Sequence, residues 1–263
     1  MSKLEEIISN KRGEIPGLKE ALSGGRYPSL KKYSGPSFLE SLKNTPDFAL
    51  IAEVKRKSPS QGSMAGGENP VEIARIFDEA GVNAISVLTD RKYFDGDFSI
   101  LRDISSSVKA PLLCKDFIID RVQVDMALAS GAAAVLLITE ALDDASLESL
   151  YNYTLSLGLD ALVEAHFSRN VKRAVDLGAR IIGINNRNLD TLEEKPGNAA
   201  SLSPLIPEGR LKLSLSSCRS RIDAIKLSDA GLDGVLIGAA VMVSEDRKAA
   251  VRQFLNIRKG GPV

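Results

Sequence analysis

Short apolar runs recur along the chain from residue 48 onward, and each is followed by a loop and by a stretch with helical spacing of apolar residues. Continuous apolar runs bounded by turn signals are typical of strands buried on both faces. The runs that we predict to be strands are 48–54, 84–88, 111–114, 133–138, 160–163, 180–184, 211–214 and 234–237. The helices that we predict to follow them are 71–80, 98–108, 121–129, 144–157, 168–177, 198–205, 221–230 and 245–257.

Several of these helical patterns are followed, directly or after one residue, by a glycine, which is the usual left-handed stop before the next strand. The glycines are Gly81, Gly131, Gly158, Gly178 and Gly231. Eight strand–helix units within about 210 residues predict an α/β fold with a single (β/α)8 TIM barrel. An open doubly wound sheet is the alternative, but no G-x-G-x-x-G follows the first strand and the repeat runs through all eight units.

Residues 1–47 precede this repeat, and we expect them to form a helical extension packed on a barrel that occupies 48–263. Residues 3–12 place Leu4, Ile7 and Ile8 on one helical stripe with charges opposite. A second short helix is predicted from Ser37 to Lys43. Since no linker or low-complexity tract interrupts the chain, we predict one domain.

The composition of the 263 residues, 44% hydrophobic and 26% charged, is that of an ordinary soluble globular protein. Lys and Arg number 34, as do Asp and Glu, so the net charge is zero. This balance argues against binding to nucleic acid or to a membrane surface, but it allows a local basic pocket. The first residues are charged and lack a signal-peptide core, and the longest apolar run, 132–138, is too short to span a bilayer. We therefore expect a cytoplasmic protein.

Two cysteines and one histidine are too few for a disulfide framework or a zinc site, so we expect reduced thiols and no metal. Cys114 lies inside a predicted strand, where it would serve in barrel packing. His166 stands alone just beyond a strand, where a structural role is the usual one.

Polar residues gather where the predicted strands end, and in a barrel of this type the carboxyl ends of the strands carry the active site. Two lysines and two glutamates are among them: Glu53, Lys55, Lys115 and Glu164. Clustered lysines tend to exchange protons near neutral pH, so the set predicts acid–base chemistry. Any one of these residues could instead belong to a salt bridge at the rim, but their convergence favours a catalytic site.

The residues after the last two strands suggest a phosphate site. Gly238 and Ala239 resemble the start of a short extra helix, whose backbone N–H groups could bind a phosphate together with Ser216 and Ser217. The alternative is an ordinary strand–helix turn.

Longer motifs then identify a family. They are Ile51-Ala-Glu-Val-Lys-Arg-Lys-Ser-Pro-Ser60, Ser86-Val-Leu-Thr-Asp90 with Tyr93-Phe94, Lys115-Asp-Phe-Ile-Ile-Asp120, Leu162-Val-Glu164 with His166, and Gly183-Ile-Asn-Asn-Arg-Asn-Leu189. In these motifs the chain resembles the indole-3-glycerol phosphate synthases of tryptophan biosynthesis over nearly its whole length.

The resemblance implies that a phosphorylated small molecule, 1-(2-carboxyphenylamino)-1-deoxyribulose 5-phosphate, is converted to indole-3-glycerol phosphate, carbon dioxide and water. It implies a carbon–carbon lyase that needs no cofactor or metal and works as a monomer or weak dimer. Lys115 matches the general acid of ring closure, and Lys55 matches the partner of the substrate carboxylate. Glu164 matches an acid–base residue, and Glu53 matches a residue that positions the lysines.

The other matched positions surround this set. Asn185 matches a catalytic-site residue, and Arg187, Lys57, Ser58 and Leu189 match substrate-binding positions, with Lys57 on the phosphate side. The expected walls of the pocket for the aromatic ring are Phe94, Phe117, Leu136 and Ile138. The expected phosphate-binding residues are Ser216, Ser217, Gly238 and Ala239. The loop 56–69 has the Gly, Ser and Pro content of a mobile lid.

The chain departs from the family after the seventh strand, where Ser214-Leu-Ser-Ser-Cys218 replaces the usual Ser-Glu-Ser-Gly-Ile. Leu215 removes a carboxylate partner for Asn185 and Arg187, and Ser217 is strained if the backbone there needs a positive φ. Ala239 replaces a frequent serine. These departures keep alternatives open: an engineered or divergent barrel with another substrate, a Schiff-base enzyme, or a non-catalytic binder of a phosphorylated ligand.

Overall fold

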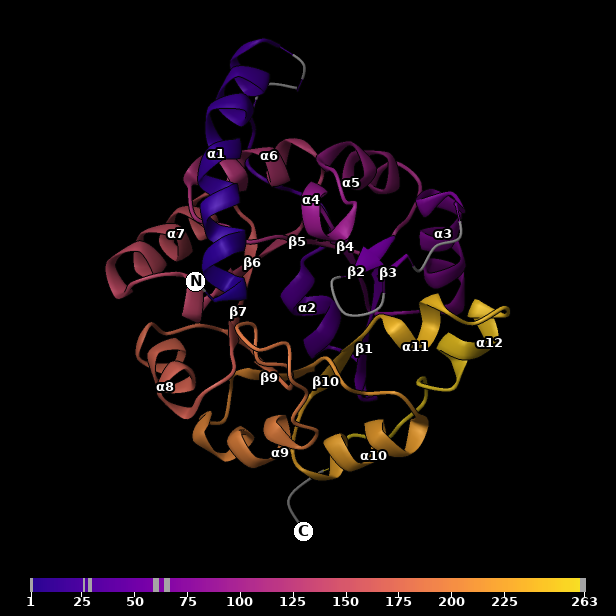
Figure 1. Ribbon diagram of the computed structural model, residues 1–263. Coiled ribbons are helices and arrows are strands. Elements are labelled where there is room, and N and C mark those ends of the chain that lie inside the picture. Colours follow the sequence, from indigo (N-terminus) through magenta and orange to yellow (C-terminus); the bar gives the residue numbers. More distant parts are fainter. Residues whose placement is uncertain (1, 26, 28–29, 59–61, 64–66, 261–263) are drawn as a thin grey trace.

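A closed barrel of eight parallel strands forms the centre of the protein in the computed structural model, which describes residues 2–25, 27, 30–58, 62–63 and 67–260 (Figure 1). The barrel order is β1-β10-β9-β8-β7-β6-β5-β4. The strands are β1 (Ala49–Val54), β4 (Ala84–Leu88), β5 (Leu112–Lys115), β6 (Ala134–Ile138), β7 (Asp160–Ala165), β8 (Ile181–Asn185), β9 (Leu211–Leu215) and β10 (Gly234–Ile237). The predicted (β/α)8 barrel is confirmed.

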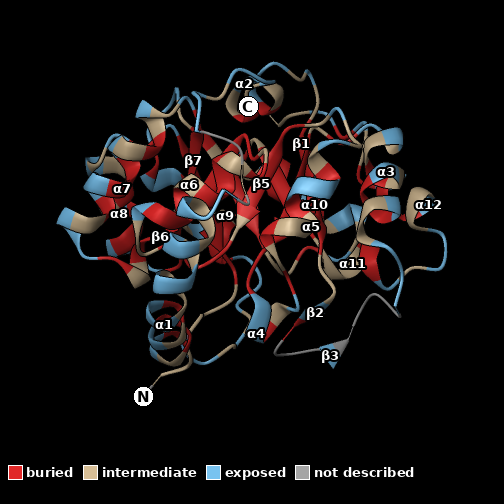
Figure 2. Ribbon diagram, turned by 90° about the horizontal axis from the view of Figure 1, so that it is seen from above, coloured by how far each residue is buried: buried red, intermediate tan, exposed pale blue. Residues whose placement is uncertain are grey.

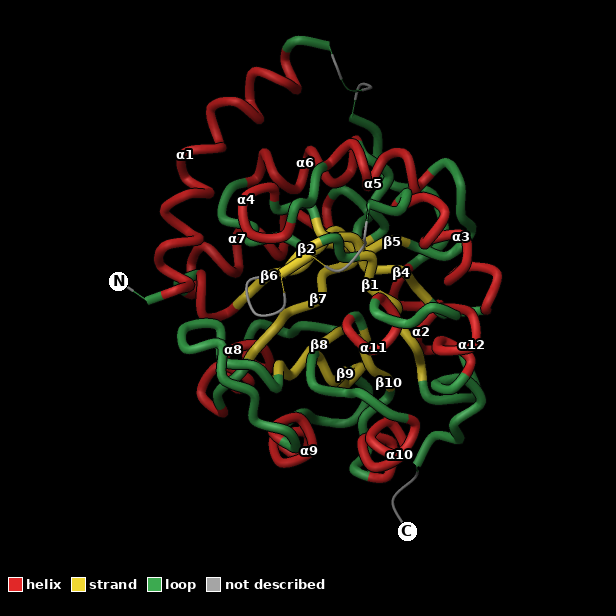
Figure 3. Tube along the Cα trace, turned by 45° about the vertical axis from the view of Figure 1, so that its right-hand side comes forward, coloured by secondary structure: helices red, strands yellow, loops and turns green. Residues whose placement is uncertain are grey.

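Helices form a ring around these strands (Figure 3). They are α3 (Pro70–Ala80), α5 (Phe98–Ser105), α6 (Arg121–Ala129), α7 (Asp144–Ser156), α8 (Ser168–Asp176), α9 (Asn198–Leu202), α10 (Arg221–Asp229), α11 (Ala239–Met242) and α12 (Arg247–Arg252), with short 3₁₀ turns η1 (Thr139–Ala141) and η2 (Ser203–Leu205). The predicted helix 198–205 divides into α9 and η2 because Pro204 has no N–H to continue the α-helical bonds. The helix predicted over 245–257 is shorter: the Asp246 side chain caps its start at the backbone N–H of Ala249, and the helix ends at Arg252.

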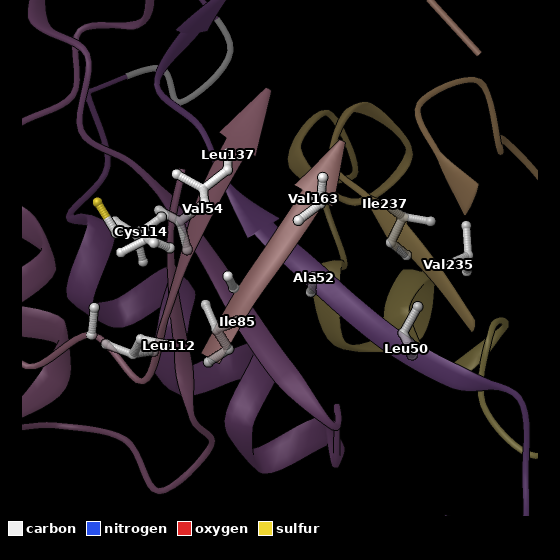
Figure 4. Packing of buried hydrophobic residues seen from close by; sticks show 14 of the residues in the cluster. Leu50, Ala52, Val54, Ile85, Leu112, Cys114, Leu137, Val163, Val235 and Ile237 are labelled. Atoms are coloured by element: carbon white, nitrogen blue, oxygen red, sulfur yellow. The ribbon is translucent and has the colours of Figure 1, made fainter. Parts of the chain in front are cut away.

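Side chains alternate between two buried layers along each strand. On β1, Leu50, Ala52 and Val54 face the surrounding helices and belong to the outer cluster, part of which Figure 4 shows. Ala49 and Ile51 belong to the cluster inside the barrel. Because successive side chains of a strand point to opposite faces, the next odd-numbered residue after Ile51 also faces inward. This alternation brings the polar strand ends together.

The first helix, α1 (Lys3–Ser23), is longer than the predicted 3–12. Leu18 and Leu22 continue the apolar stripe beyond Pro16 and pack against the core, which explains why the helix extends past the proline. Helix α2 (Phe38–Lys43) begins after its Ser37 cap, as predicted.

Helices α1 and α2 lie at opposite ends of the barrel (Figure 2). The side chain of Asp160, at the start of β7, accepts hydrogen bonds from Ser37 and Leu39, so α2 covers the amino ends of the strands. At the carboxyl ends, Lys11 of α1 forms ion pairs with Asp90 and Asp116, which follow β4 and β5.

Two elements were not predicted. One is the short helix α4 (Arg91–Phe94), and the other is a hairpin of β2 (Lys57–Ser58) and β3 (Gly62–Ser63) after β1. Residues 59–61 and 64–66 of the expected lid lie outside the described residues. Among the residues that are described, no helix is long and apolar enough to cross a membrane.

Candidate active site

Glu53, Lys55 and Lys115, three of the predicted acid–base residues, line a pocket at the carboxyl end of the barrel. Glu53 and Lys115 occupy inward-facing positions at the ends of β1 and β5, and Lys55 follows β1 directly. Glu164, inward-facing on β7, is buried behind them, with its Oε2 atom 3.9 Å from the Lys115 Nζ. The structure thus brings together the acid–base set that the sequence predicts.

The Glu53 carboxylate is held in its charged form. Its Oε1 atom accepts a hydrogen bond of 2.7 Å from the Lys55 Nζ. Burial alone raises the pKa of Glu53, but the positive charges of Lys55 and Lys115 outweigh burial and hold this pKa below its ordinary value. Gly238 makes this arrangement possible, because a Cβ atom there would lie 2.7 Å from Glu53 Oε1 and 3.0 Å from Lys55 Nζ.

The pKa of Glu164 is shifted in the opposite direction from that of Glu53. Burial raises the pKa of Glu164 above its ordinary value, and the attraction of Lys115 and a 2.7 Å hydrogen bond from the Asn185 Nδ2 offset only part of this effect. Within the described part of the chain, the Glu164 Oε2 atom is buried without a hydrogen-bond partner. Two carboxyl groups pushed in opposite directions are a typical sign of separate acid and base roles.

Asn185, at the carboxyl end of β8, and Arg187, two residues later, both line the pocket. The Asn185 Oδ1 accepts a hydrogen bond from the backbone N–H of Arg187, which fixes the start of the loop. The Arg187 guanidinium donates to the carbonyl of Leu192 and pairs with the Glu194 carboxylate. Leu215, the predicted departure from the family motif, is buried in the barrel against Gly183.

The expected phosphate end of the pocket is lined by Ser216, Ser217, Gly238 and Ala239. Ser216 and Ser217 have φ values of 64° and 60°, a left-handed conformation that favours glycine. The strain foreseen for a serine at position 217 is therefore present. Asn186 holds this turn, since its Nδ2 donates to the carbonyls of Leu215 and Ser216 and to the Ser214 hydroxyl.

The apolar wall contains only part of the expected set. Phe94 and Phe117, with ring centroids 6.2 Å apart, line the pocket with Leu189 and Ser58. Leu136 and Ile138 do not line it, because inward-facing residues of β6 are buried in the barrel interior. Lys57 does not line it either, since its place in the β2–β3 hairpin leaves it exposed.

Several lining residues were not identified from the sequence. Ile7 reaches the pocket from α1, and Leu192, Glu194, Cys218 and Arg219 reach it from loops. The apolar stripe of α1 predicted that Ile7 is buried but gave no position for it. No motif pointed to Glu194 or Arg219.

His166 and Cys114 have the structural roles that were expected. The His166 Nδ1 lies 2.8 Å from the carbonyl oxygen of Asn185, and Cys114 is fully buried in the outer cluster. Within the described ranges, no group of three or more His, Cys, Asp or Glu residues is arranged to hold a metal ion.

An enzyme of acid–base chemistry on a (β/α)8 barrel is the class that this fold and this pocket define. A family model described as "Indole-3-glycerol phosphate synthase" matches residues 4–254, and the chain belongs to this family. The family is one of carboxy-lyases in tryptophan biosynthesis.

Individual relatives agree with this assignment. A protein of Exiguobacterium sibiricum named indole-3-glycerol phosphate synthase is 42% identical over 94% of this chain and 94% of its own length. A protein of the same name from Leptospira interrogans is 41% identical over 95% of this chain and 96% of its own length. Among solved structures, a thiamine phosphate pyrophosphorylase from Pyrococcus furiosus covers 80% of this chain and 94% of its own, with a TM-score of 0.61 and 18% identity, which supports the fold alone.

Proposed function

We propose that this pocket closes the indole ring of 1-(2-carboxyphenylamino)-1-deoxyribulose 5-phosphate, with loss of carbon dioxide and water, and that Lys115 is its general acid. The observation that carries the proposal is the convergence of two lysines and two buried carboxyl groups, with Lys55 Nζ 2.7 Å from Glu53 Oε1 and Lys115 Nζ 3.9 Å from Glu164 Oε2. Ring closure, decarboxylation and dehydration require proton transfers at different atoms, and such a set of groups can supply them.

In the first step, the ring carbon that carries the carboxylate bonds to the ketone carbon. Lys115 gives a proton to the ketone oxygen, which becomes a hydroxyl group. Lys55 pairs with the substrate carboxylate, and Glu53 positions Lys55 through their 2.7 Å contact. The aromatic ring of the substrate lies against Phe94 and Phe117, so that its reacting carbon is held near the ketone.

In the later steps, the bond to the carboxylate breaks, and its electron pair restores the aromatic ring as carbon dioxide leaves. The hydroxyl group then accepts a proton and departs as water, while the neighbouring carbon loses its proton to form the indole double bond. Glu164 fits these transfers, because its raised pKa makes it easier to protonate than an ordinary carboxylate. Asn185 orients Glu164 through its hydrogen bond, and Arg187 supports the sugar end.

In this proposal the substrate phosphate binds at the side of the pocket formed by the turns after β9 and β10. Ser216, Ser217, Gly238 and Ala239 line that side. The Ser217 Oγ is buried there without a hydrogen-bond partner among the described residues, and it can donate to a phosphate oxygen.

The test is incubation of the purified protein with the carboxyphenylamino deoxyribulose phosphate, following released carbon dioxide and indole absorbance together. We expect both products in equal amounts, and much slower turnover of the same compound without its phosphate. Folded protein that releases neither product would contradict the proposal.

A second candidate follows from the altered turn at Leu215 and Ser217: a barrel of this family that accepts a different phosphorylated carbonyl compound. Borohydride trapping of a substrate on Lys55 or Lys115 would favour such an enzyme, because ring closure forms no Schiff base. Thermal stabilisation by a phosphorylated ligand without turnover would favour a binding protein.

We further propose that the protein acts in the cytoplasm, as a monomer or weak dimer, without nucleic-acid or membrane partners. The zero net charge supports the absence of nucleic-acid and membrane-surface partners. We also infer that residues 1–47 and the barrel 48–263 work as one unit, since Ile7 of the extension lines the pocket.

A further inference from the structure

Two guanidinium groups share one carboxylate at the pocket, and one of them, Arg219, lies two residues after Ser217 of the proposed phosphate site. Arg187 follows β8 and Arg219 follows β9, and both line the pocket together with Glu194. Glu194 pairs with Arg187 through its Oε1 atom, and its Oε2 atom lies 2.6 Å from the Nη2 of Arg219. Two positive charges and one negative charge leave this group of three side chains with a net positive charge.

The lysines near the pocket have other surroundings. Lys55 is hydrogen-bonded to Glu53, Lys115 lies 3.9 Å from the Glu164 carboxylate, and Lys57 is exposed and does not line the pocket. A phosphate monoester carries close to two negative charges at neutral pH, so it needs cationic partners as well as hydroxyl and backbone donors. Ala239, where the family often has a serine, supplies no hydroxyl group.

The two arginines differ in how firmly they are held. Arg187 has a side chain only 23% exposed and donates to the Leu192 carbonyl as well as to Glu194. The Arg219 side chain is 70% exposed, although its backbone N–H is fixed by a 3.0 Å hydrogen bond to the Asp223 carboxylate. The backbone of Arg219 is therefore fixed, while its exposed guanidinium group can turn from Glu194 toward a bound anion.

We propose that Arg219 is a phosphate-binding residue of this pocket, held beside it by Glu194 until the phosphate arrives. The planar fork of arginine matches two phosphate oxygens, and it offsets the hydroxyl group that Ala239 lacks. The inference rests on the proposed function for the presence of a phosphate in the substrate. The competing account is that Arg219 forms only an exposed ion pair, which would affect stability slightly and phosphate binding not at all.

The experiment is titration calorimetry of the full chain with inorganic phosphate. We expect Arg219→Ala to weaken phosphate binding about tenfold, as for loss of a hydrogen bond to a charged group. Arg219→Lys, which keeps the charge but loses the fork, should weaken it less. The matched control is Arg75→Ala, because Arg75 is an exposed arginine paired with Glu72 on α3 and does not line the pocket. This control should bind phosphate as the parent protein does.

Equal phosphate affinity of the Arg219→Ala variant and the parent protein would overturn the inference, as would a parent protein that binds no phosphate at millimolar concentration. Kinetics then separate the two proposals. If the parent protein fails to form indole product but Arg219→Ala still weakens phosphate binding, the proposed reaction is wrong and the phosphate ligand stands. If product forms and Arg219→Ala leaves KM unchanged, the reaction stands and the phosphate ligand is wrong.

Discussion

Lys11 of the first helix and Asp116, the residue after Lys115, are joined by an ion pair of 2.7 Å in buried surroundings. Lys11 also pairs with Asp90 at 2.9 Å. Burial of the ammonium lowers the pKa of Lys11, but Asp116 and Asp90 outweigh this effect and raise the pKa above its ordinary value. The Asp116 Oδ1 in turn accepts a hydrogen bond from the backbone N–H of Phe117, so this ion pair orders the strand end that carries Lys115.

Lys11→Met should destabilise the protein, because it leaves two buried carboxylates without their cation. We expect a loss of about 3–5 kcal/mol in the free energy of unfolding, measured by urea denaturation. Lys19→Met on the same helix is the control, since its ion pair with Asp120 is exposed and should contribute less than about 1 kcal/mol. Equal effects of the two substitutions would show that the buried ion pair does not stabilise α1.

Glu164→Gln should lower turnover by about 10² or more, as for loss of an acid–base group, while making the folded state more stable at neutral pH. A carboxyl group whose pKa is raised in the folded protein binds more protons folded than unfolded. Its contribution to stability therefore falls as pH rises from the ordinary carboxyl range through the folded-state pKa. Unfolding curves at pH 4 and pH 7 check this, and the gain should be confined to the higher pH.

Glu53→Gln is the matched comparison and should have the opposite effect on stability. The folded-state pKa of Glu53 is lowered, so its contribution is present above the unfolded-state pKa and is lost as pH falls through the folded-state pKa. Glu53→Gln should therefore destabilise the protein at pH 7. If both variants change the free energy of unfolding at pH 7 in the same direction, the pKa values of the two carboxyl groups are not shifted in opposite directions.

Ser217→Gly should stabilise the protein by about 1 kcal/mol, because glycine adopts the left-handed conformation without the steric cost of a Cβ atom. For a chain of this size the melting temperature should rise by about 2–4 °C in calorimetry. Ser106→Gly, at a position with φ of −82°, is the control and should lower the melting temperature. A decrease for Ser217→Gly would contradict the assignment of backbone strain to this serine.

Leu215→Glu restores the family residue, but we expect it to destabilise the protein by about 2–4 kcal/mol, because it buries a carboxylate while Arg187 is already paired with Glu194. Adding Glu194→Gln frees Arg187 for the new carboxylate. The double variant should be more stable than the sum of the single effects predicts, by about 1 kcal/mol or more in a double-mutant cycle. Additive effects would show that the side chains at positions 194 and 215 do not compete for Arg187.

The barrel and the acid–base set could be predicted from the sequence because both follow from local patterns. Apolar runs mark the strands, and a two-residue period carries Glu53 and Lys115 to the inward face once the strand is known. Leu136 and Ile138 have the same inward period, but the sequence could not show at what depth the pocket floor lies. Arg219 was missed because its role depends on a loop from another unit, which brings Glu194 to it.

The most direct test of the account compares the parent protein with Lys115→Ala, following indole fluorescence from the carboxyphenylamino deoxyribulose phosphate. The side chain of Lys115 is one-fifth exposed and lines the pocket, so circular dichroism and urea unfolding should show a folded variant. We predict that turnover falls by about 10³ or more, since the ketone oxygen loses its proton donor. Unchanged turnover in the folded variant would contradict the assignment of Lys115 as the general acid.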